Sequence, residues 1–484
     1  MKTTNADTAS LTAPALDPKR WLALVVSSVA TLMVVLDVSI VNIALPHAQS
    51  DLGMTDANRQ WMITAYAPAF GGLLLLGGRI ADFIGRKRAL TIGLLGFAAA
   101  SALGGMTPEP ITLFAGRALQ GAFAALFAPA ALSLITVAFT DSGERSKAFG
   151  IYGAFQGAGG AVGLLLGGTL TEYAGWIWCM YINVPIALAT ALAARYVVRE
   201  SRAAGTRRYD VPGALLATGG LVALVHGFTQ ASEGAGWSAP ATIALLATAV
   251  LLLTAFVAVE RRTAHPLLPL RVVIDRNRAG VYLAYLLIGA GMFGMNLFMT
   301  YFLQVNLGYT PLLTGFAFLP FSIGVITTTT LAPPLVGRFG PKVLMTGGIP
   351  LAIAGLLWLT RLDPASGYVT AVLPTQLLVG VGVGLFHLSG PNIALSGIAP
   401  GDAGVASAAL NTSQQVGAAL GPALLNTFYL AAVADLGTAH TTAARLSSYV
   451  HGYRVAFAAS AVLFVLALTA VTCLIRSHRN TATA

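Results

Sequence analysis

The stretch Leu36-Asp37-Val38-Ser39-Ile40-Val41-Asn42-Ile43-Ala44-Leu45-Pro46 places one carboxylate within an apolar run that is long enough to cross a bilayer. From Trp21 to Leu45 the chain holds no other charged residue. A charge at that depth costs from about 3 to more than 10 kcal/mol, depending on the measurement, and charged residues inside spans usually have a function. The stretch therefore predicts a transmembrane helix with Asp37 as a functional residue. The alternative is a carboxylate that stays protonated or reaches a water defect.

The composition of the chain places it in a membrane. Hydrophobic residues make up 56% of it and charged residues only 10%, and its mean hydropathy is +0.76. Soluble proteins have about 25% charged residues. A net charge of +10 would suggest a nucleic-acid partner in a soluble chain, but in a membrane protein basic residues record topology. We therefore expect the lipid bilayer as partner and no nucleic acid. The two cysteines fall in expected helices, so neither a disulfide framework nor a metal site is predicted.

Apolar runs of membrane-spanning length predict fourteen transmembrane helices. They cover residues 21–45, 58–78, 89–106, 110–138, 148–170, 177–197, 211–230, 240–259, 279–303, 313–334, 342–361, 369–392, 404–432 and 453–475. Lysine and arginine concentrate in alternate loops, including residues 79–88, 195–208 and 261–278, and are scarce in the others. By the positive-inside rule this predicts a multi-pass, all-α protein of the cell membrane with both termini in the cytoplasm.

Two sets of glycines indicate an internal repeat. The loop Gly78–Arg88 has a weaker copy at Gly337–Lys342, and Gly159-x-x-x-Gly163 has a counterpart in Gly417-x-x-x-Gly421. The two correspondences are nearly in register, at separations of 255 and 258 residues. A parallel repeat of six helices accounts for both. We predict a six-helix bundle over residues 1–200, a linker with two extra helices over 201–265, and a second six-helix bundle over 266–484.

Four motifs in order along the chain resemble the fourteen-helix drug:proton antiporter branch of the major facilitator superfamily. They are Leu36–Pro46, Gly78–Arg88, Arg117–Gly121 and Gly150–Gly168. The resemblance covers the whole chain and implies the major-facilitator fold, alternating access, and proton-coupled export of amphipathic drugs or antibiotics. It implies that the proton gradient drives transport without any cofactor, and we expect a functional monomer that is not an enzyme.

Two positions depart from the pattern of that branch. Leu164 stands where the fifth-helix motif has a proline, which puts the usual kink of that helix in doubt. The sixth helix begins with Trp176-Ile177-Trp178 where an arginine is expected between the tryptophans, and Ile182-Asn183-Val184-Pro185 follows. The glycines that allow close approach of helices remain.

The loop and the fifth helix supply candidates for conformational gating. In the loop, Asp82 lies among basic residues, and the resemblance implies contacts with the second half that hold the cytoplasmic side closed. Small residues at helical spacing let two helices pack closely and slide. The alternatives are a plain topology signal in the loop and static packing in the helix. The gating candidates are Gly78, Asp82, Gly85, Arg86, Gly159, Gly163 and Gly167.

Asp37 and Arg117 are predicted to lie at the same depth. Asp37 is about 12 Å from the outer end of its helix and Arg117 about 10 Å from the same face, at 1.5 Å per residue. Two opposite charges at one depth are expected to face the interior and to pair directly or through water. A neighbouring cation favours the ionised carboxylate and burial favours the protonated one, so the pair suits proton coupling.

The cargo is expected to be a neutral or singly charged amphipathic molecule, because no acidic residue lies at mid-depth in the second half. Thioethers, aromatic rings and amides form adaptable binding surfaces, although packing or lipid contact would use the same residues. The candidates for a substrate cavity are Asn42, Gln120, Met292, Asn296, Met299, Tyr301 and Gln304.

Other classes of function fit less well. An intramembrane enzyme would need a catalytic set, and only one acid lies at mid-membrane depth. A channel would need a repeat of charge along a pore. The alternative that stays open is a transporter of the same fold with another cargo, such as nutrient uptake or export of a lipid or metabolite.

Overall fold

The computed structural model describes residues 18–55, 58–59, 61–106, 109–139, 142–202, 210–231, 236–263, 266, 268–398, 403–434 and 441–476. Within these residues every regular element is a helix and none is a strand. Both chain termini and most of the predicted basic linker near residues 203–209 lie outside the described residues, as do the basic residues Lys2, Arg207, Arg208 and Arg479 that contribute to the topology prediction.

Within the described residues the first half has eight helical segments. They are α1 (Arg20–Asp51), α2 (Trp61–Thr64), α3 (Tyr66–Ile84), α4 (Arg86–Met106), α5 (Pro110–Ala138), α6 (Ser142–Tyr173), α7 (Trp178–Tyr181) and α8 (Asn183–Val197). Proline at the first position of α5 starts that helix without the loss of a backbone hydrogen bond. Gly85, with φ of 109°, turns the chain sharply between α3 and α4.

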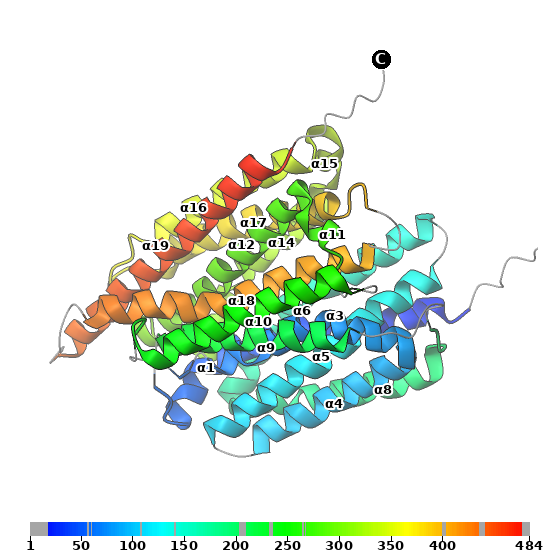
Figure 1. Cartoon of the computed structure of the whole chain (residues 1–484). Coiled ribbons are helices and arrows are strands. Elements are labelled where there is room, and N and C mark those ends of the chain that lie inside the picture. The colour runs from blue at the N-terminus through cyan, green and yellow to red at the C-terminus, as the bar shows by residue number, and fades with distance from the viewer. Residues whose placement is uncertain are drawn as a thin grey trace, which may run out of the picture.

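The second half repeats this order. Its elements are α11 (Leu270–Ile274), α12 (Arg276–Tyr301), the π-helical turn η2 (Phe302–Asn306), α13 (Pro311–Ala317), α14 (Leu319–Leu331), α15 (Pro333–Phe339), α16 (Pro341–Leu359), the π-helical turn η3 (Tyr368–Val372), α17 (Leu373–Ala394), α18 (Ala403–Ala434) and α19 (Thr442–Leu474). In Figure 1 the first half fills the lower part of the view and the second half the upper part. The start of α1 and the end of α19 lie toward the same side of the molecule, which we call the terminal side; the opposite side is the far side.

Helix packing follows the same plan in both halves. In the first half α1 packs against α6 and α8, and α4 packs against α5 and α8. In the second half α12 packs in the same way against α18 and α19, and α16 packs against α17 and α19. The matching partners are those that a parallel repeat predicts.

The two inserted helices, α9 (Val211–Gln230) and α10 (Pro240–Arg262), form an antiparallel pair between the halves. Helix α9 contacts α3 of the first half and α18 of the second, and Val225 is buried with Ala67 and Ala419 in one small apolar cluster. Helix α10 is mostly exposed, as expected for a helix that faces lipid.

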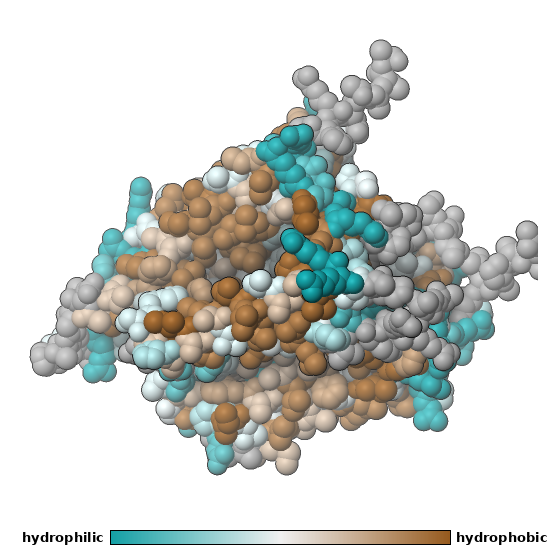
Figure 2. Space-filling view, viewed as in Figure 1, coloured by the Kyte–Doolittle hydropathy of each residue, from teal (hydrophilic) through white to brown (hydrophobic). Residues whose placement is uncertain are grey.

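The surface has the polarity of a membrane protein. Figure 2 shows apolar residues over the middle of the visible face and hydrophilic residues toward the ends of the helices. Twelve described helices are long and apolar enough to span a membrane. The predicted second span is a pair, Trp61–Leu74 and Leu76–Ile84, bent by 56°, and brings the number to thirteen if it counts as one span. The predicted fifth span falls on α6, which is one unbroken helix of 32 residues.

Candidate functional site

Helix α1 carries Asp37 and is held close to α6 by glycines. A Cβ atom at Gly159 would lie 2.9 Å from the carbonyl oxygen of Leu32, and one at Gly163 would lie 2.8 Å from that of Leu36. Gly167 is equally close to the backbone of the next turn of α1. No other residue type fits at such distances without moving one helix. These three gating candidates therefore contact a helix of their own half in this conformation.

A second close crossing brings Tyr66 beside Arg117. A Cβ atom at Gly121 of α5 would lie 2.3 Å from the carbonyl oxygen of Tyr66 at the start of α3. The aromatic ring of Tyr66 then lies 4.8 Å from the guanidinium carbon of Arg117. The backbone oxygen of Met62 accepts a hydrogen bond of 2.9 Å from Nε of Arg117.

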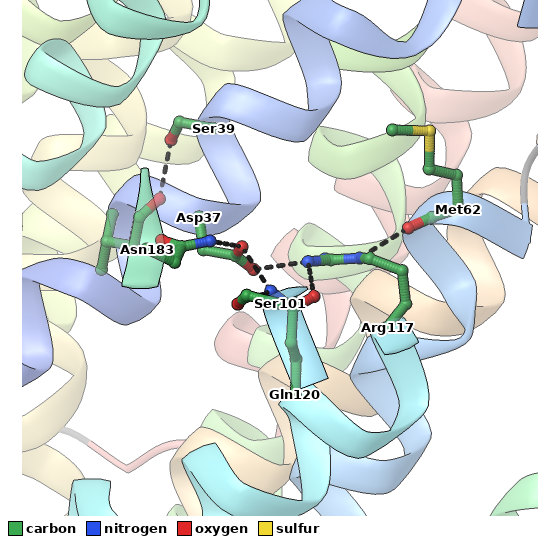
Figure 3. Close-up of polar contacts among 8 residues, drawn as sticks. Asp37, Ser39, Met62, Ser101, Arg117, Gln120 and Asn183 are labelled. Atoms are coloured by element: carbon green, nitrogen blue, oxygen red, sulfur yellow. Dashed lines mark hydrogen bonds and ion pairs between the residues drawn. The ribbon is translucent and has the colours of Figure 1, made fainter. Parts of the chain in front are cut away.

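The structure brings Asp37 and Arg117 into direct contact. Nη1 of Arg117 lies 2.5 Å from Oδ2 of Asp37, and the two side chains are 1% and 0% exposed. Gln120 lies one helical turn beyond Arg117 and bridges the pair. It accepts from Nη1 of Arg117 at 2.8 Å and donates to Oδ1 of Asp37 at 3.1 Å. Figure 3 shows these side chains converging between α1 and α5.

The carboxylate is completed by Asn183 at the start of α8. Nδ2 of Asn183 donates to Oδ1 of Asp37 at 2.7 Å, and Ser101 of α4 receives the second hydrogen of the Gln120 amide at 2.7 Å. Asp37 thus accepts from three donors, one of them charged. An ionised carboxylate is an acceptor only, whereas a protonated one must donate. The arrangement matches the ionised acid, because all three of these neighbours donate to it and one of them carries a positive charge.

A small cavity connects this network with the seam between the halves. It measures about 10 Å³ and is lined by Arg117 and Tyr66 from the first half and by Phe293 and Gln415 from the second. That volume is about the room of one water molecule. Arg117 of the charged network therefore lines the same small cavity as two side chains of the second half. The cavity is too small for a cargo molecule.

Three of the cavity candidates lie in direct contacts between α1 and either the end of α12 or the turn η2 that follows it. Nδ2 of Asn42 donates to Oγ1 of Thr300 at 3.0 Å, and Nε2 of Gln304 donates to the backbone oxygen of Ile43 at 3.1 Å. The hydroxyl of Tyr301 donates to Oε1 of Gln49. In this conformation these side chains fasten the two halves to each other.

The other cavity candidates are divided between packing and the charged network. Gln120 belongs to the Asp37 network and is fully buried there. Met299 is fully buried in an apolar cluster to which both halves contribute, and Met292 packs against that cluster while partly exposed. Asn296 is partly exposed, and its side-chain oxygen Oδ1 has no hydrogen-bond partner among the described residues. Of this group only Met292 and Asn296 keep some accessible surface.

The charged loop packs largely on its own half. Asp82 accepts from Nε and Nη2 of Arg86 at 3.0 and 2.8 Å, one turn further along the chain. Glu200, beyond the end of α8, lies against Gly85, where a Cβ atom would come within 2.4 Å of its carboxylate. Gly78 makes only an ordinary contact with the side chain of Pro129. A hydrogen bond of 3.2 Å from Arg79 to the backbone oxygen of Pro266 does reach beyond the first half.

Leu164 lies in an uninterrupted stretch of α6. A Cβ atom at Gly315 of α13 would lie 2.5 Å from the carbonyl oxygen of Leu164, and one at Gly168 would lie 2.6 Å from Cα of Leu312. The close contact between halves on this flank thus uses Gly168 and Gly315, on a different face of α6 from the glycines that meet α1.

Sequence reasoning did not identify Asn183 and Ser101, whose side chains belong to the hydrogen-bond network around Asp37. Asn183 stands at the position after Ile182 in the motif of the sixth span, and Ser101 is one of several small residues of α4. An amide within the membrane needs hydrogen-bond partners, so Asn183 carried a usable signal. Ser101 carried none, because serine is common in membrane helices and can bond to its own helix.

Comparison with known proteins agrees with this architecture. Residues 27–422 match the Major Facilitator Superfamily. The puromycin resistance protein pur8 of Streptomyces alboniger is 51% identical over 460 residues, which cover 94% of this chain and 91% of that protein. The cephamycin export protein CmcT of Amycolatopsis lactamdurans is 38% identical over 93% of this chain and 91% of its own length.

A solved structure shares the fold. The crystal structure of a bacterial homologue of the human lysosomal transporter Spinster superposes with a TM-score of 0.67. The alignment covers 96% of this chain and all of the other, at 17% sequence identity. The likeness at that identity concerns the arrangement of the helices alone.

Proposed function

The chain belongs to the major facilitator superfamily, and from this premise we propose that it exports amphipathic antibiotics from the cell in exchange for protons. Relatives named for puromycin resistance and cephamycin export support the direction and the kind of cargo. The chain is a multi-pass protein of the cell membrane. It needs no cofactor in this proposal, since the proton gradient supplies the free energy, and a monomer is sufficient.

The topology of the proposal has fourteen spans, with both termini and the terminal side of the molecule in the cytoplasm. Its parts are the bundle 1–200, the linker and inserted pair 201–265, and the bundle 266–484. The far side, where α1 meets α12, then faces outward. The concentration of basic residues in the loops on the terminal side supports this orientation.

The observation that carries the proton coupling is the fully buried Asp37 with its three donors. Cargo moving into the seam has to disturb Tyr66 and Arg117, which line the small cavity there. Once Arg117 turns away, the buried carboxylate loses its compensating charge and takes up a proton. Return of Arg117 expels that proton, and alternating access decides to which side it goes.

Transport of puromycin in proteoliposomes tests the proposal. With an imposed pH gradient the protein should concentrate puromycin against its gradient, and dissipation of the pH gradient should stop this. Asp37→Asn should abolish the accumulation. Asp275→Asn is a matched control, because it removes the charge of a 41% exposed carboxylate at the start of α12. Puromycin movement that does not depend on the pH gradient would contradict proton coupling. In a separate assay with whole cells, uptake of a compound in place of export would favour the alternative, a transporter of the same fold with another cargo.

A further inference from the structure

Arg59, in the short segment between α1 and α2, is buried against the second half. Its side chain is only 2% exposed, although an arginine at the edge of a membrane protein could reach water. The guanidinium carbon lies 3.9 Å from the centroid of the Tyr301 ring and 5.5 Å from that of Tyr429. A cation over two aromatic faces is attracted by their quadrupoles, and more strongly where water is excluded.

Tyr429, one of the two rings over which Arg59 lies, belongs to an aromatic cluster; together with Tyr301 we call this cluster the far-side cage. Tyr429 and Tyr453 are stacked at 5.5 Å, and Phe298 lies 5.1 Å from the ring of Tyr429 and 6.1 Å from that of Tyr453. With Tyr301, these rings come from α12, α18 and α19, and none is more than 4% exposed. The cage belongs wholly to the second half, whereas the cation inside it belongs to the first.

Arg59 is therefore part of the seam that closes the far side. The hydroxyl of Tyr301 donates to Gln49, and Asn42 and Gln304 make two further hydrogen bonds across the seam. The halves cannot separate here unless Arg59 leaves the cage. Separation uncovers the ring faces of Tyr301 and Tyr429, which already accommodate one organic cation.

We propose that the far-side cage is a binding site for the positively charged group of a monocationic amphiphile, and that Arg59 occupies it as a tethered substitute while the far side is closed. The inference rests on the proposed export function and specifies one part of it, the class of cargo and the place that it passes on the way out. The ring faces of Tyr301 and Tyr429 attract one positive charge through their quadrupoles, which suits a monocation. Tethering gives Arg59 a high effective concentration, so the cage closes again as soon as cargo departs.

Binding of tetraphenylphosphonium to the purified protein in nanodiscs tests this site without any need for transport. Arg59→Gln removes the tethered cation and should tighten binding at least tenfold, because the probe no longer competes with the side chain. Neutral triphenylphosphine oxide should bind with less than a twofold change. Adding Tyr301→Leu to Arg59→Gln should return the affinity for tetraphenylphosphonium to the wild-type value or weaker.

Two further variants make the result decisive. Arg59→Lys keeps a tethered cation and should resemble the wild type, which separates loss of charge from misfolding. Arg454→Gln removes an exposed arginine that donates to the backbone oxygen of Thr360 within the second half, and should change nothing. Equal affinities in the wild type and Arg59→Gln, or equal tightening of the neutral probe, would overturn the cation site. Neither outcome depends on puromycin export. The failure of the export proposal and the failure of the cation site can therefore be told apart.

Discussion

The variant Asp37→Asn distinguishes the contribution of Asp37 to stability from its proposed role in proton coupling. The change keeps the shape of the side chain and removes its charge. In the wild type, Nη1 of Arg117 lies 2.5 Å from Oδ2 of Asp37. The amide oxygen of the asparagine can still accept from Gln120 and Asn183, which turns the NH2 group toward Nη1. In the other orientation an uncharged oxygen faces Nη1. The guanidinium, 1% exposed, then has no counter-charge in direct contact.

The expected size of the effect follows from that burial. Removing one partner of a buried ion pair typically costs about 3–5 kcal/mol, because the remaining charge is left uncompensated. We expect Asp37→Asn and Arg117→Gln each to lower the free energy of unfolding by an amount in this range. The double variant Asp37→Asn/Arg117→Gln should lose less than the sum of the two, since no buried charge remains, and the difference is the coupling energy of the pair.

Two measurements on the same preparations decide the matter. Denaturant unfolding in detergent gives the stability of the four proteins in the cycle, and proteoliposomes with an imposed pH gradient give puromycin accumulation. The double variant should be more stable than the sum of the two single losses predicts, and it should still fail to concentrate puromycin. The reasoning is refuted if Asp37→Asn concentrates puromycin when only protons can drive it, or if the two single losses of stability simply add in the double variant.

Three other variants address gating and helix packing. Asp82→Asn should impair transport while stability falls by less than about 1 kcal/mol, because its ion pair is partly exposed; normal transport, or an equal loss in Glu144→Gln, would remove Asp82 from gating. Leu164→Pro should destabilise the protein by about 3 kcal/mol or more in thermal or denaturant unfolding, since α6 is unbroken there; an unchanged stability would mean that the helix already tolerates a kink. Gly163→Ala should slow transport and lower the free energy of unfolding by about 1–3 kcal/mol, because a Cβ atom would lie 2.8 Å from the α1 backbone. Gly153→Ala is the control, since no described atom lies within 4 Å of its Cβ position. A comparable effect in Gly153→Ala would show that helix propensity and not the contact is responsible.

Much of the fold follows from the sequence because the bilayer restricts it so strongly. Backbone groups in lipid must bond within their own segment, so each long apolar run becomes a helix and its position can be predicted to within a few residues. The largest misplacement is at α19, which begins at Thr442, well before the predicted start at residue 453. The polar first turns of that helix lie beyond the apolar run and leave no hydropathy signal.

The sequence also determined that Asp37 and Arg117 meet. Burying either charge alone in lipid is unfavourable in free energy, and helix geometry places the two residues at one depth. An ion pair between them is therefore the arrangement of lowest free energy that the sequence predicts. Which neutral groups join them was decided by tertiary structure. Gln120, Asn183 and Ser101 come from three helices, and their approach depends on the rotation of each helix about its axis, which glycine crossings such as Gly121 against Tyr66 determine.

For the glycines and for the cargo candidates, spacing identified a helix face but not its partner. Gly159 and Gly163 were expected at a moving interface, and they lie against α1 of the same half, while Gly168 meets the second half. Tyr301 was expected in a cavity, and in this conformation its ring covers Arg59. A repeat of small or aromatic residues shows that something packs there, but several helices of similar composition compete for each face. Only the complete packing of the two bundles decides which helix occupies it.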